Sequence, residues 1–222
     1  MKNGDTAHTR NRYEWIAPLY NLMEWPVEQL WYKKWRRELW QHISGPKVLE
    51  IGVGTGKNIP YYPEDIELTS IDLSSGMLKR AKRLLKGKKQ DHVIFKEMDV
   101  QQMNFPDNTF DEVVATFVFC SVPDPILGLK EALRVTKPSG RLYLIEHMKP
   151  RQPFLAKMME TLDAPIHYLS GVHIARETVG NVNEAGWNID NVQNLTAKGI
   201  FKKIEATKPL IWPTPKADMS AT

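Results

Sequence analysis

Residues 47–57 read Lys-Val-Leu-Glu-Ile-Gly-Val-Gly-Thr-Gly-Lys, and this stretch decides the fold. Its first half is a short apolar run typical of a buried parallel strand, and its second half is a glycine-rich turn. Glycines let the backbone bend sharply and let a ligand approach without a Cβ in the way. The spacing G-x-G-x-G differs from the dinucleotide fingerprint G-x-G-x-x-G, because residue 57 is lysine. The turn therefore predicts a ligand site and disfavours a nicotinamide-dependent oxidoreductase.

Strands and helices alternate along the rest of the chain. We expect strands at 47–51, 67–71, 93–96, 112–119, 141–146, 187–194 and 199–206. We expect helices at 75–86, capped by Ser74 or Ser75, at 125–135, at 154–169 with a break at Pro165, and at 176–185. This alternation predicts an α/β fold: a doubly wound, Rossmann-like, seven-stranded and mostly parallel sheet with helices on both faces. Ligands then bind beyond the carboxyl ends of the strands.

The chain of 222 residues is expected to form one domain over 13–206. Residues 1–12 are expected to be a disordered N-terminus, and 207–222 a flexible tail that contains prolines. Within the domain, 13–43 is predicted to be an N-terminal helical lid, broken at Pro26.

Composition sets the expected compartment and partners. The longest strongly apolar run, Val113–Val122, is about half a membrane-spanning helix, and the polar N-terminus predicts no signal peptide. One cysteine, Cys120, excludes an internal disulfide and is expected to be a small buried side chain. We therefore expect a cytoplasmic protein without a metal site. A formal net charge of +4 does not by itself indicate nucleic-acid binding, and no nucleic-acid partner is expected.

Three acidic residues stand at the ends of the first three predicted strands. Glu50 precedes the first glycine, Asp72 ends the second strand, and Asp99 follows the third. A carboxylate at Asp72 can accept both hydroxyls of a ribose, and Asp99 can accept a hydrogen bond from an adenine amino group. The acids favour a cationic adenosyl ligand over a pyrophosphate. The alternative is that Asp72 caps a helix and Asp99 is a turn residue.

The chain resembles the class I S-adenosylmethionine-dependent methyltransferases, of the branch containing quinone (menaquinone/ubiquinone) and bacterial phospholipid N-methyltransferases. The resemblance spans roughly 13–206, and its matching stretches are 48–56, 71–74, 98–100, 105–111 and 133–142. One departure is Ser139, where that branch usually has glycine.

The resemblance implies S-adenosyl-L-methionine as cofactor. It implies cofactor contacts at Tyr13, Tyr20, Glu50, Gly52, Gly54, Gly56, Asp72, Leu73, Met77, Asp99, Val100, Thr116 and Phe117. The two tyrosines match the family's lid, although Glu14 and Asn21 replace its usual acids. We expect catalytic roles for Tyr20 and for His147, which follows the fifth strand and can accept a proton or orient a head group. His167 and His173 lie in the variable stretch that usually forms the acceptor lid.

The acceptor is less clear from sequence, because methyl transfer depends mainly on alignment and needs a strong base only for a protonated acceptor. We favour N-methylation of phosphatidylethanolamine at a membrane surface. The alternatives are C-methylation of a quinone precursor, S-methylation of a small thiol, and a non-catalytic binding module. Methylation of DNA bases is disfavoured, because no Asp/Asn-Pro-Pro-aromatic motif follows the fourth strand. Nothing indicates an oligomeric state.

Two basic segments have different predicted roles. Residues 79–89 are predicted to be the solvated face of a surface helix. In the first segment Val27, Trp31, Trp35 and Leu39 share a helical face, with Lys33, Arg36 and Arg37 on the opposite side. This pattern suits peripheral contact with an anionic membrane. The alternative is that the tryptophans pack onto the sheet and the basic residues are solvated.

Overall fold

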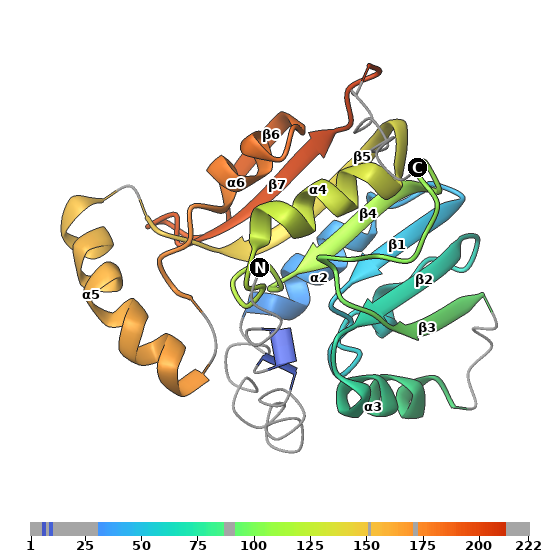
Figure 1. Cartoon of the computed structure of the whole chain (residues 1–222), viewed down its shortest axis with the longest axis horizontal. Coiled ribbons are helices and arrows are strands. Elements are labelled where there is room, and N and C mark those ends of the chain that lie inside the picture. The colour runs from blue at the N-terminus through green and yellow to red at the C-terminus, as the bar shows by residue number, and fades with distance from the viewer. Residues whose placement is uncertain are drawn as a thin grey trace, which may run out of the picture.

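A computed structural model describes residues 6–7, 9–10, 31–86, 92–150, 152–170 and 173–211. Within these residues seven strands form one sheet in the order β3-β2-β1-β4-β5-β7-β6 (Figure 1). The strands are β1 Lys47–Ile51, β2 Glu67–Asp72, β3 Val93–Glu97, β4 Phe110–Thr116, β5 Thr136–His147, β6 Asn188–Asn194 and β7 Phe201–Thr207. Strand β7 pairs antiparallel with both β5 and β6, and all other neighbouring strands pair in parallel. The predicted fold class is confirmed.

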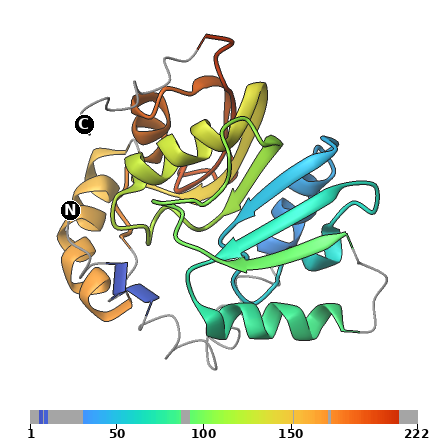
Figure 2. The ribbon, with the colours of Figure 1, turned by 45° about the vertical axis from the view of Figure 1, so that its right-hand side comes forward.

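Helices cover both faces of the sheet (Figure 2). These helices are α2 Lys33–Trp40, α3 Ser75–Leu85, α4 Pro125–Val135 and α6 Thr178–Glu184. Helix α5 Pro153–Ser170 stands away from the sheet (Figure 1), and a 3-10 turn η2 spans Ile59–Tyr61. Successive strand residues alternate between the two hydrophobic cores, as a pleated strand requires. Val113 points into the core under α4 and α6, whereas Val114 points into the core under α2 and α3. As predicted, Ser74 caps α3, since its Oγ accepts a hydrogen bond from the Met77 N–H.

Several details of the predicted elements are wrong. Strand β5 begins at Thr136, five residues before its predicted start at 141. Strand β4 ends at Thr116 and not at residue 119, because Phe117 adopts a left-handed conformation with φ of 60°. Helix α5 continues through Pro165 without the predicted break. A proline inside a helix frees a carbonyl one turn earlier, here that of Thr161. Thr161 and Pro165 are both exposed, so water can bind this carbonyl.

Described residues near both ends of the chain contact the domain. Residues 6–7 and 9–10 are helical, and the Thr6 Oγ1 accepts a hydrogen bond from Gln101 Nε2 at 3.1 Å. Beyond β7, Lys208 is buried, and its Nζ donates to the carbonyl oxygen of Thr136 at 2.6 Å. These contacts lie within the two stretches, 1–12 and 207–222, for which we predicted a disordered N-terminus and a flexible tail. Most of the lid, including 13–30, lies outside the described residues.

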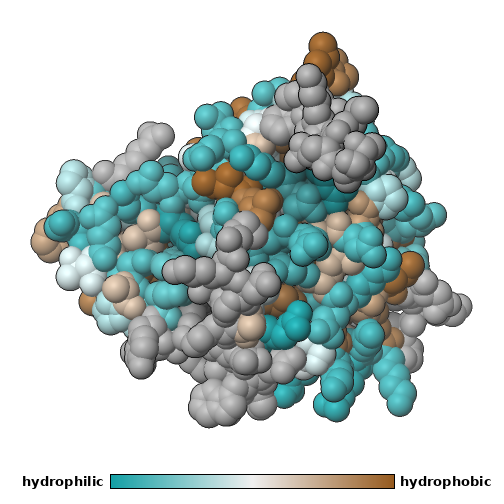
Figure 3. Space-filling model, in the orientation of Figure 1, coloured by the Kyte–Doolittle hydropathy of each residue, from teal (hydrophilic) through white to brown (hydrophobic). Residues whose placement is uncertain are grey.

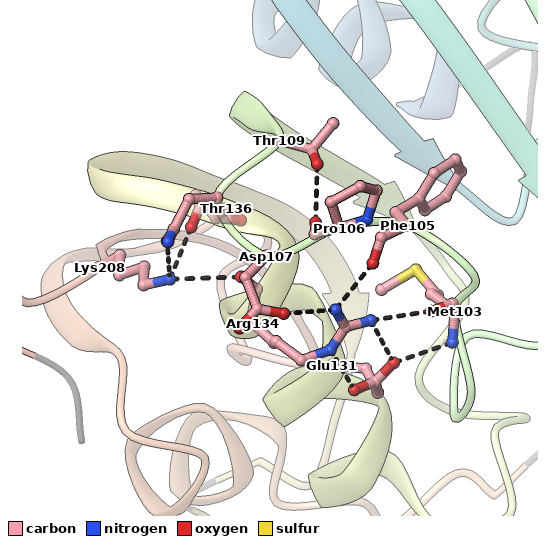
Figure 4. A network of polar contacts seen from close by, with 10 residues as sticks. Met103, Phe105, Pro106, Asp107, Thr109, Glu131, Arg134, Thr136 and Lys208 are labelled. Atoms are coloured by element: carbon pink, nitrogen blue, oxygen red, sulfur yellow. Dashed lines mark hydrogen bonds and ion pairs between the residues drawn. The ribbon is translucent and has the colours of Figure 1, made fainter. Parts of the chain in front are cut away.

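Arg134 organises a polar network where the chain enters β4 and leaves α4 (Figure 4). Its guanidinium donates to the carbonyl oxygens of Met103 and Phe105, both at 2.8 Å, and to Oδ1 of Asp107 at 2.7 Å. Two further bonds reach the Glu131 carboxylate. The family motifs at 105–111 and 133–142 thus meet in one place, where they fix the loop before β4. Ser139, the departure from the family pattern, has a left-handed φ of 61°.

The first basic helix packs differently from its predicted amphipathic pattern. Trp35, Leu39 and Trp40 are buried against the sheet, while Trp31 is half exposed. Lys33 and Arg37 are solvated, but Arg36 is buried together with the tryptophans. The prediction that Arg36 lies on the solvent side is wrong. In the second basic segment, the described residues Lys79, Lys82 and Arg83 are exposed, as predicted. None of the helices in the described part of the chain is long and apolar enough to cross a membrane.

Candidate cofactor and active site

A cavity that is partly open to solvent lies beyond the carboxyl ends of β1, β2 and β4. The strand order reverses between β1 and β4, which makes this edge the switch point where α/β sheets bind ligands. Nine residues that we predicted to contact the cofactor lie in its wall: Gly52, Gly54, Asp72, Leu73, Met77, Asp99, Val100, Thr116 and Phe117.

The three glycines of the loop have different roles. Gly52 has φ of +71°, and a Cβ there would lie 2.4 Å from Val118 Cγ2. Gly54 has φ of +55° with open space above it, so its backbone can approach a ligand. A Cβ on Gly56 would instead lie 2.5 Å from Ile59 Cδ1. Gly56 is absent from the cavity wall, so its predicted contact is replaced by a packing role.

Asp72 lies in the wall with its carboxylate fixed by two backbone N–H groups. Oδ2 accepts from Gly54 at 2.8 Å and Oδ1 accepts from Ser74 at 2.9 Å. Burial raises the pKa of this carboxyl to about 6, although both bonds favour the charged form. The carboxylate is therefore ionised at neutral pH, and its remaining lone pairs can accept the hydroxyls of a ribose. The cap of α3 is Ser74 and not Asp72, which removes the helix-capping alternative.

Asp99 combines the two roles that we considered. Its Oδ1 accepts hydrogen bonds from the main-chain N–H of Gln101 at 2.8 Å and from the side-chain Nε2 of Gln101 at 3.1 Å, so it is a turn residue. It also lies in the cavity wall next to Val100. Its carboxylate is thus held in place at the side of the cavity where we expect the adenine.

Glu50 lies beneath the cavity and not in its wall. Its side chain is fully buried, and it accepts hydrogen bonds from Asn58 Nδ2 at 2.6 Å, from Ser70 Oγ at 2.8 Å and from the Tyr62 hydroxyl. Burial raises the pKa of this carboxyl, while these bonds oppose the rise. The carboxylate is buried away from the cavity wall, so we expect its effect on a cofactor to be indirect. Glu50 holds the chain that follows the glycine loop.

Arg36 is a wall residue that the sequence analysis missed. It is 5% exposed, and its Nη1 donates to Thr116 Oγ1 at 2.6 Å and to Asn58 Oδ1 at 2.9 Å. Its guanidinium also lies 5.1 Å from the ring centre of Phe117. A guanidinium in this position suits the carboxylate of an amino-acid ligand. The sequence did contain one signal that Arg36 is buried. It lies four residues before Trp40, so both residues share one face of the helix.

Glu146 fixes the loop after β4, which forms the opposite wall. Its fully buried carboxylate accepts, through Oε1, the N–H of Val118 at 2.8 Å and that of Phe119 at 3.0 Å. Burial raises the pKa of this group to about 7, although these bonds lower it. The two hydrogen bonds from Val118 and Phe119 to Glu146 fix the loop, so its left-handed residue Phe117 is held against the cavity.

His147 does not lie in the wall formed by the described residues. Its ring packs 5.6 Å from the ring of Phe201, and burial lowers its pKa. We had predicted that it faces the pocket, and its packing on β7 explains the difference. Tyr13 and Tyr20 lie outside the described residues. Cys120 is buried, as predicted. In the described stretches, no group of three or more histidine, cysteine, aspartate or glutamate side chains could hold a metal ion.

The wall fits a sulfonium nucleoside. Asp72 offers acceptors for a ribose, Met77 and Val100 offer apolar contacts for an adenine, and Arg36 offers a charged donor for a carboxylate. The backbone over Gly54 is open to close approach. When bound, such a cofactor supplies an activated methyl group, and the protein supplies alignment and exclusion of water.

Comparison with known proteins supports this assignment. A family model described as a methyltransferase domain matches residues 49–144. Phosphatidylethanolamine N-methyltransferase of Cereibacter sphaeroides is 35% identical over 57% of the chain, and the match spans 64% of that relative's length. Demethylmenaquinone methyltransferase of Clavibacter sepedonicus is 30% identical over 82% of the chain and 81% of its own length. Thiol S-methyltransferase TMT1B of Rattus norvegicus is 31% identical over 69% of each chain.

Solved structures show the same fold. A methyltransferase of Methanosarcina mazei has a TM-score of 0.61 at 26% identity and covers 74% of this chain and 93% of its own. An N-methyltransferase of Haemonchus contortus, solved with phosphomonomethylethanolamine and S-adenosylhomocysteine, has a TM-score of 0.68 at 15% identity and covers 90% of this chain and 60% of its own. The chain is an enzyme that belongs to the class I S-adenosylmethionine-dependent methyltransferases, in the branch of the quinone and phospholipid methyltransferases.

Proposed function

We propose that the enzyme methylates the amine of an ethanolamine phospholipid. The observation that carries this proposal is an exposed apolar stripe on α5, the helix that stands beyond the carboxyl ends of β4 and β5 (Figure 1). Phe154, Met158 and Leu162 are 79%, 44% and 43% exposed, and their spacing of four places them on one face of the helix. Figure 3 shows hydrophobic patches among hydrophilic ones over this helix.

An apolar stripe of this kind suits contact with acyl chains at a bilayer surface. In this proposal the enzyme is a cytoplasmic protein that binds peripherally to the inner face of an anionic membrane, and α5 contributes to the contact. The tryptophans Trp35 and Trp40 do not contribute, because they are buried against the sheet. The choice of phosphatidylethanolamine as acceptor is supported by the 35% identity to an enzyme of that name.

A second candidate is C-methylation of a quinone precursor. A demethylmenaquinone methyltransferase of Paenarthrobacter aurescens is 28% identical over 87% of the chain, which is a longer match than that of the phospholipid enzyme. A prenylated quinone is also a lipid and would use the same apolar stripe. S-methylation of a small thiol, suggested by the rat relative, would give the stripe no role in binding the acceptor.

The test is mass spectrometry of methylated products from the full chain and methyl-labelled cofactor. Three acceptors are supplied separately: phosphatidylethanolamine in vesicles, a reduced demethylquinone in detergent micelles, and a small alkyl thiol. Vesicles of phosphatidylcholine alone serve as the control. Label on the ethanolamine nitrogen supports the proposal. Label only on the quinone ring or only on sulfur overturns it in favour of the corresponding alternative.

A further inference from the structure

A cluster of titratable side chains lies beside the cavity, outside the cofactor wall. Asp163 and His167 come from α5, and His173 comes from the segment that follows this helix. His173 Nδ1 lies 2.7 Å from Asp163 Oδ2, and the rings of His167 and His173 stack with centres 3.8 Å apart and planes within 13°. The cofactor site does not use these residues.

The Asp163 carboxylate is held in its charged form. Its Oδ1 accepts the N–H of Ile174 at 2.6 Å and that of Ala175 at 2.9 Å. Burial alone would raise the pKa of this carboxyl, but its bonds to His173 and to the two N–H groups outweigh burial and lower it. A charged carboxylate only accepts hydrogen bonds, so the Nδ1 of His173 must carry a proton.

This pairing fixes the tautomer of His173. With the proton on Nδ1, the neutral ring keeps a lone pair on Nε2, which is the form of a base that a carboxylate orients. The side chain of His173 is 30% exposed, so the ring is open to solvent and to a ligand. If Asp163 served only to hold the chain at Ile174 and Ala175, the hydrogen bonds to Oδ1 would suffice. That role would not explain why Oδ2 pairs with the ring of His173.

The cluster adjoins the wall of the cofactor cavity. The main-chain N–H of His173 donates to the Cys120 carbonyl at 2.9 Å, and Arg176 Nη2 donates to the Val122 carbonyl at 2.9 Å. The residues next to these contacts, Ser121 and Pro123, line the cavity. The base is therefore anchored to the same loop that borders the cofactor, on the side of the molecule that carries the apolar stripe of α5.

We propose that His173, oriented by Asp163, accepts the proton of the acceptor's ammonium group. This inference rests on the proposed N-methylation. Loss of the ammonium proton to Nε2 of His173 exposes the nitrogen lone pair. A nitrogen–carbon bond then forms to the methyl carbon while the sulfur–carbon bond breaks, and the sulfonium becomes a neutral thioether. His173 later releases the proton to solvent through its exposed edge.

Other charged groups face this cluster from each side. The charge of Asp163 acts to raise the pKa of His147 on β5 and that of Arg176. Cys120, Asp124 and Glu146 also act to raise the pKa of Arg176. His167 covers one face of the His173 ring.

The first test needs no acceptor and no activity. Long-range proton–nitrogen NMR of the full chain reports which ring nitrogen of each neutral histidine carries the proton. In the wild type we expect the Nδ1–H tautomer for His173, and in Asp163→Asn a shift towards Nε2–H, because the amide can donate to Nδ1. A wild-type His173 in the Nε2–H form, or a tautomer that Asp163→Asn leaves unchanged, overturns the proposal.

The second test measures single-turnover methylation of phosphatidylethanolamine vesicles across pH. His173→Asn keeps a donor for Asp163 but removes the base, so at neutral pH we expect a rate about 10²–10³-fold lower. The deficit should shrink towards pH ~10, where a primary amine loses its proton unaided. Affinity for S-adenosylhomocysteine should stay within about twofold, and the exposed His42→Asn serves as the control.

Several results separate this proposal from its alternatives. A wild-type rate in His173→Asn, or a loss that is equal at every pH, means that the residue is structural and overturns the proposal. A wild-type enzyme that methylates no amine overturns the proposed function. The tautomer of His173 then still decides whether the oriented base exists.

Discussion

The cofactor side and the acceptor side of this enzyme are built in different ways. On the cofactor side, which comprises the loops after β1, β2 and β4, acidic side chains such as Asp72 and Glu146 accept hydrogen bonds from backbone N–H groups. On the acceptor side, formed by α5 and the segment up to Arg176, apolar side chains such as Phe154 are exposed. The cofactor side is thus fixed before a small ligand binds, whereas the acceptor side leaves an apolar surface uncovered by the described residues.

This difference shows how one fold separates two tasks. Alignment of a reactive methyl group requires fixed donors and acceptors, because small displacements cost much of the rate. Binding of a lipid requires apolar area, which is non-directional. We expect changes on the cofactor side to act on ligand affinity and on stability. Changes on the acceptor side should alter membrane binding and the transfer of the acceptor's ammonium proton to His173.

The largest effect is expected from Asp72→Ala, which removes the ribose acceptor, one anchor of the glycine loop at Gly54 and one anchor of the start of α3 at Ser74. Each hydrogen bond to a charged group contributes about 1.5–3 kcal/mol, so affinity for S-adenosylhomocysteine should fall by at least about a hundredfold. Isothermal titration calorimetry measures this loss, and Asp190→Ala on the edge strand β6 is the control. If the comparison of the two sides holds, the His173 tautomer stays unchanged. Undiminished affinity would contradict the assignment of the cavity.

The next effect concerns Glu146, where the two sides meet. Its pKa is about 7 in the folded protein against an ordinary value of 4.5, so the folded state binds more protons between these values. Its contribution to the free energy of unfolding is therefore greatest at low pH and falls as the pH rises to about 7, by up to ~3 kcal/mol. In Glu146→Gln this fall disappears, while the amide oxygen can still accept from Val118 and Phe119.

Urea unfolding at pH 5 and pH 8 measures this dependence. The free energy of unfolding of the wild type should be lower at pH 8 than at pH 5 because of Glu146. The difference in stability between Glu146→Gln and the wild type should therefore shift in favour of the variant from pH 5 to pH 8. The exposed Glu184→Gln on α6 should follow the wild type at both pH values. Parallel pH profiles for Glu146→Gln and the wild type would show that the buried carboxyl does not titrate in this range.

The sequence predicts the cofactor side well because its signals are local. The glycine spacing, the acid at the end of β2 and the cap at Ser74 each depend on a few neighbouring residues, and the structure places Gly54, Asp72 and Asp99 in one cavity wall. The sheet follows from the alternation of strands and helices. Local sequence signals therefore suffice to predict the cofactor side, from β1 up to the end of β4.

The errors occur where tertiary contacts override local signals. In α2 the apolar residues do not lie on a single face, so their pattern does not show whether Arg36 is buried. Only its hydrogen bonds to Thr116 and Asn58 show that it is. Glu50 stands at the expected place, but protein donors surround it. Lys208 lies after the last strand in a proline-containing tail, yet it returns to the Thr136 carbonyl. None of these partners is near in sequence.

A smaller effect is expected from Arg36→Lys, which tests whether α2 belongs to the cofactor side. A lysine ammonium is a point charge and cannot span Thr116, Asn58 and a ligand carboxylate as a planar guanidinium can. Affinity for S-adenosylhomocysteine should fall by about tenfold, equal to about 1.4 kcal/mol. Affinity for 5′-methylthioadenosine, which lacks the amino-acid carboxylate, should not change. Equal losses for both ligands would mean that Arg36 only supports the wall, and Arg37→Lys on the solvated side is the control.

The smallest effect on stability is expected from replacing the whole stripe of α5 by glutamine, at Phe154, Met158 and Leu162. These side chains are exposed and glutamine is a good helix former, so the free energy of unfolding should change by less than about 1 kcal/mol. Affinity for S-adenosylhomocysteine should also stay the same. Sedimentation with anionic vesicles, in contrast, should fall strongly, because the apolar area that enters the bilayer is gone. The matched control replaces Leu210 and Ile211, which are 77% and 91% exposed near the other end of the sheet. If that control loses vesicle binding as much as the α5 variant does, the contact is unspecific and the two sides of the molecule do not divide their tasks in this way.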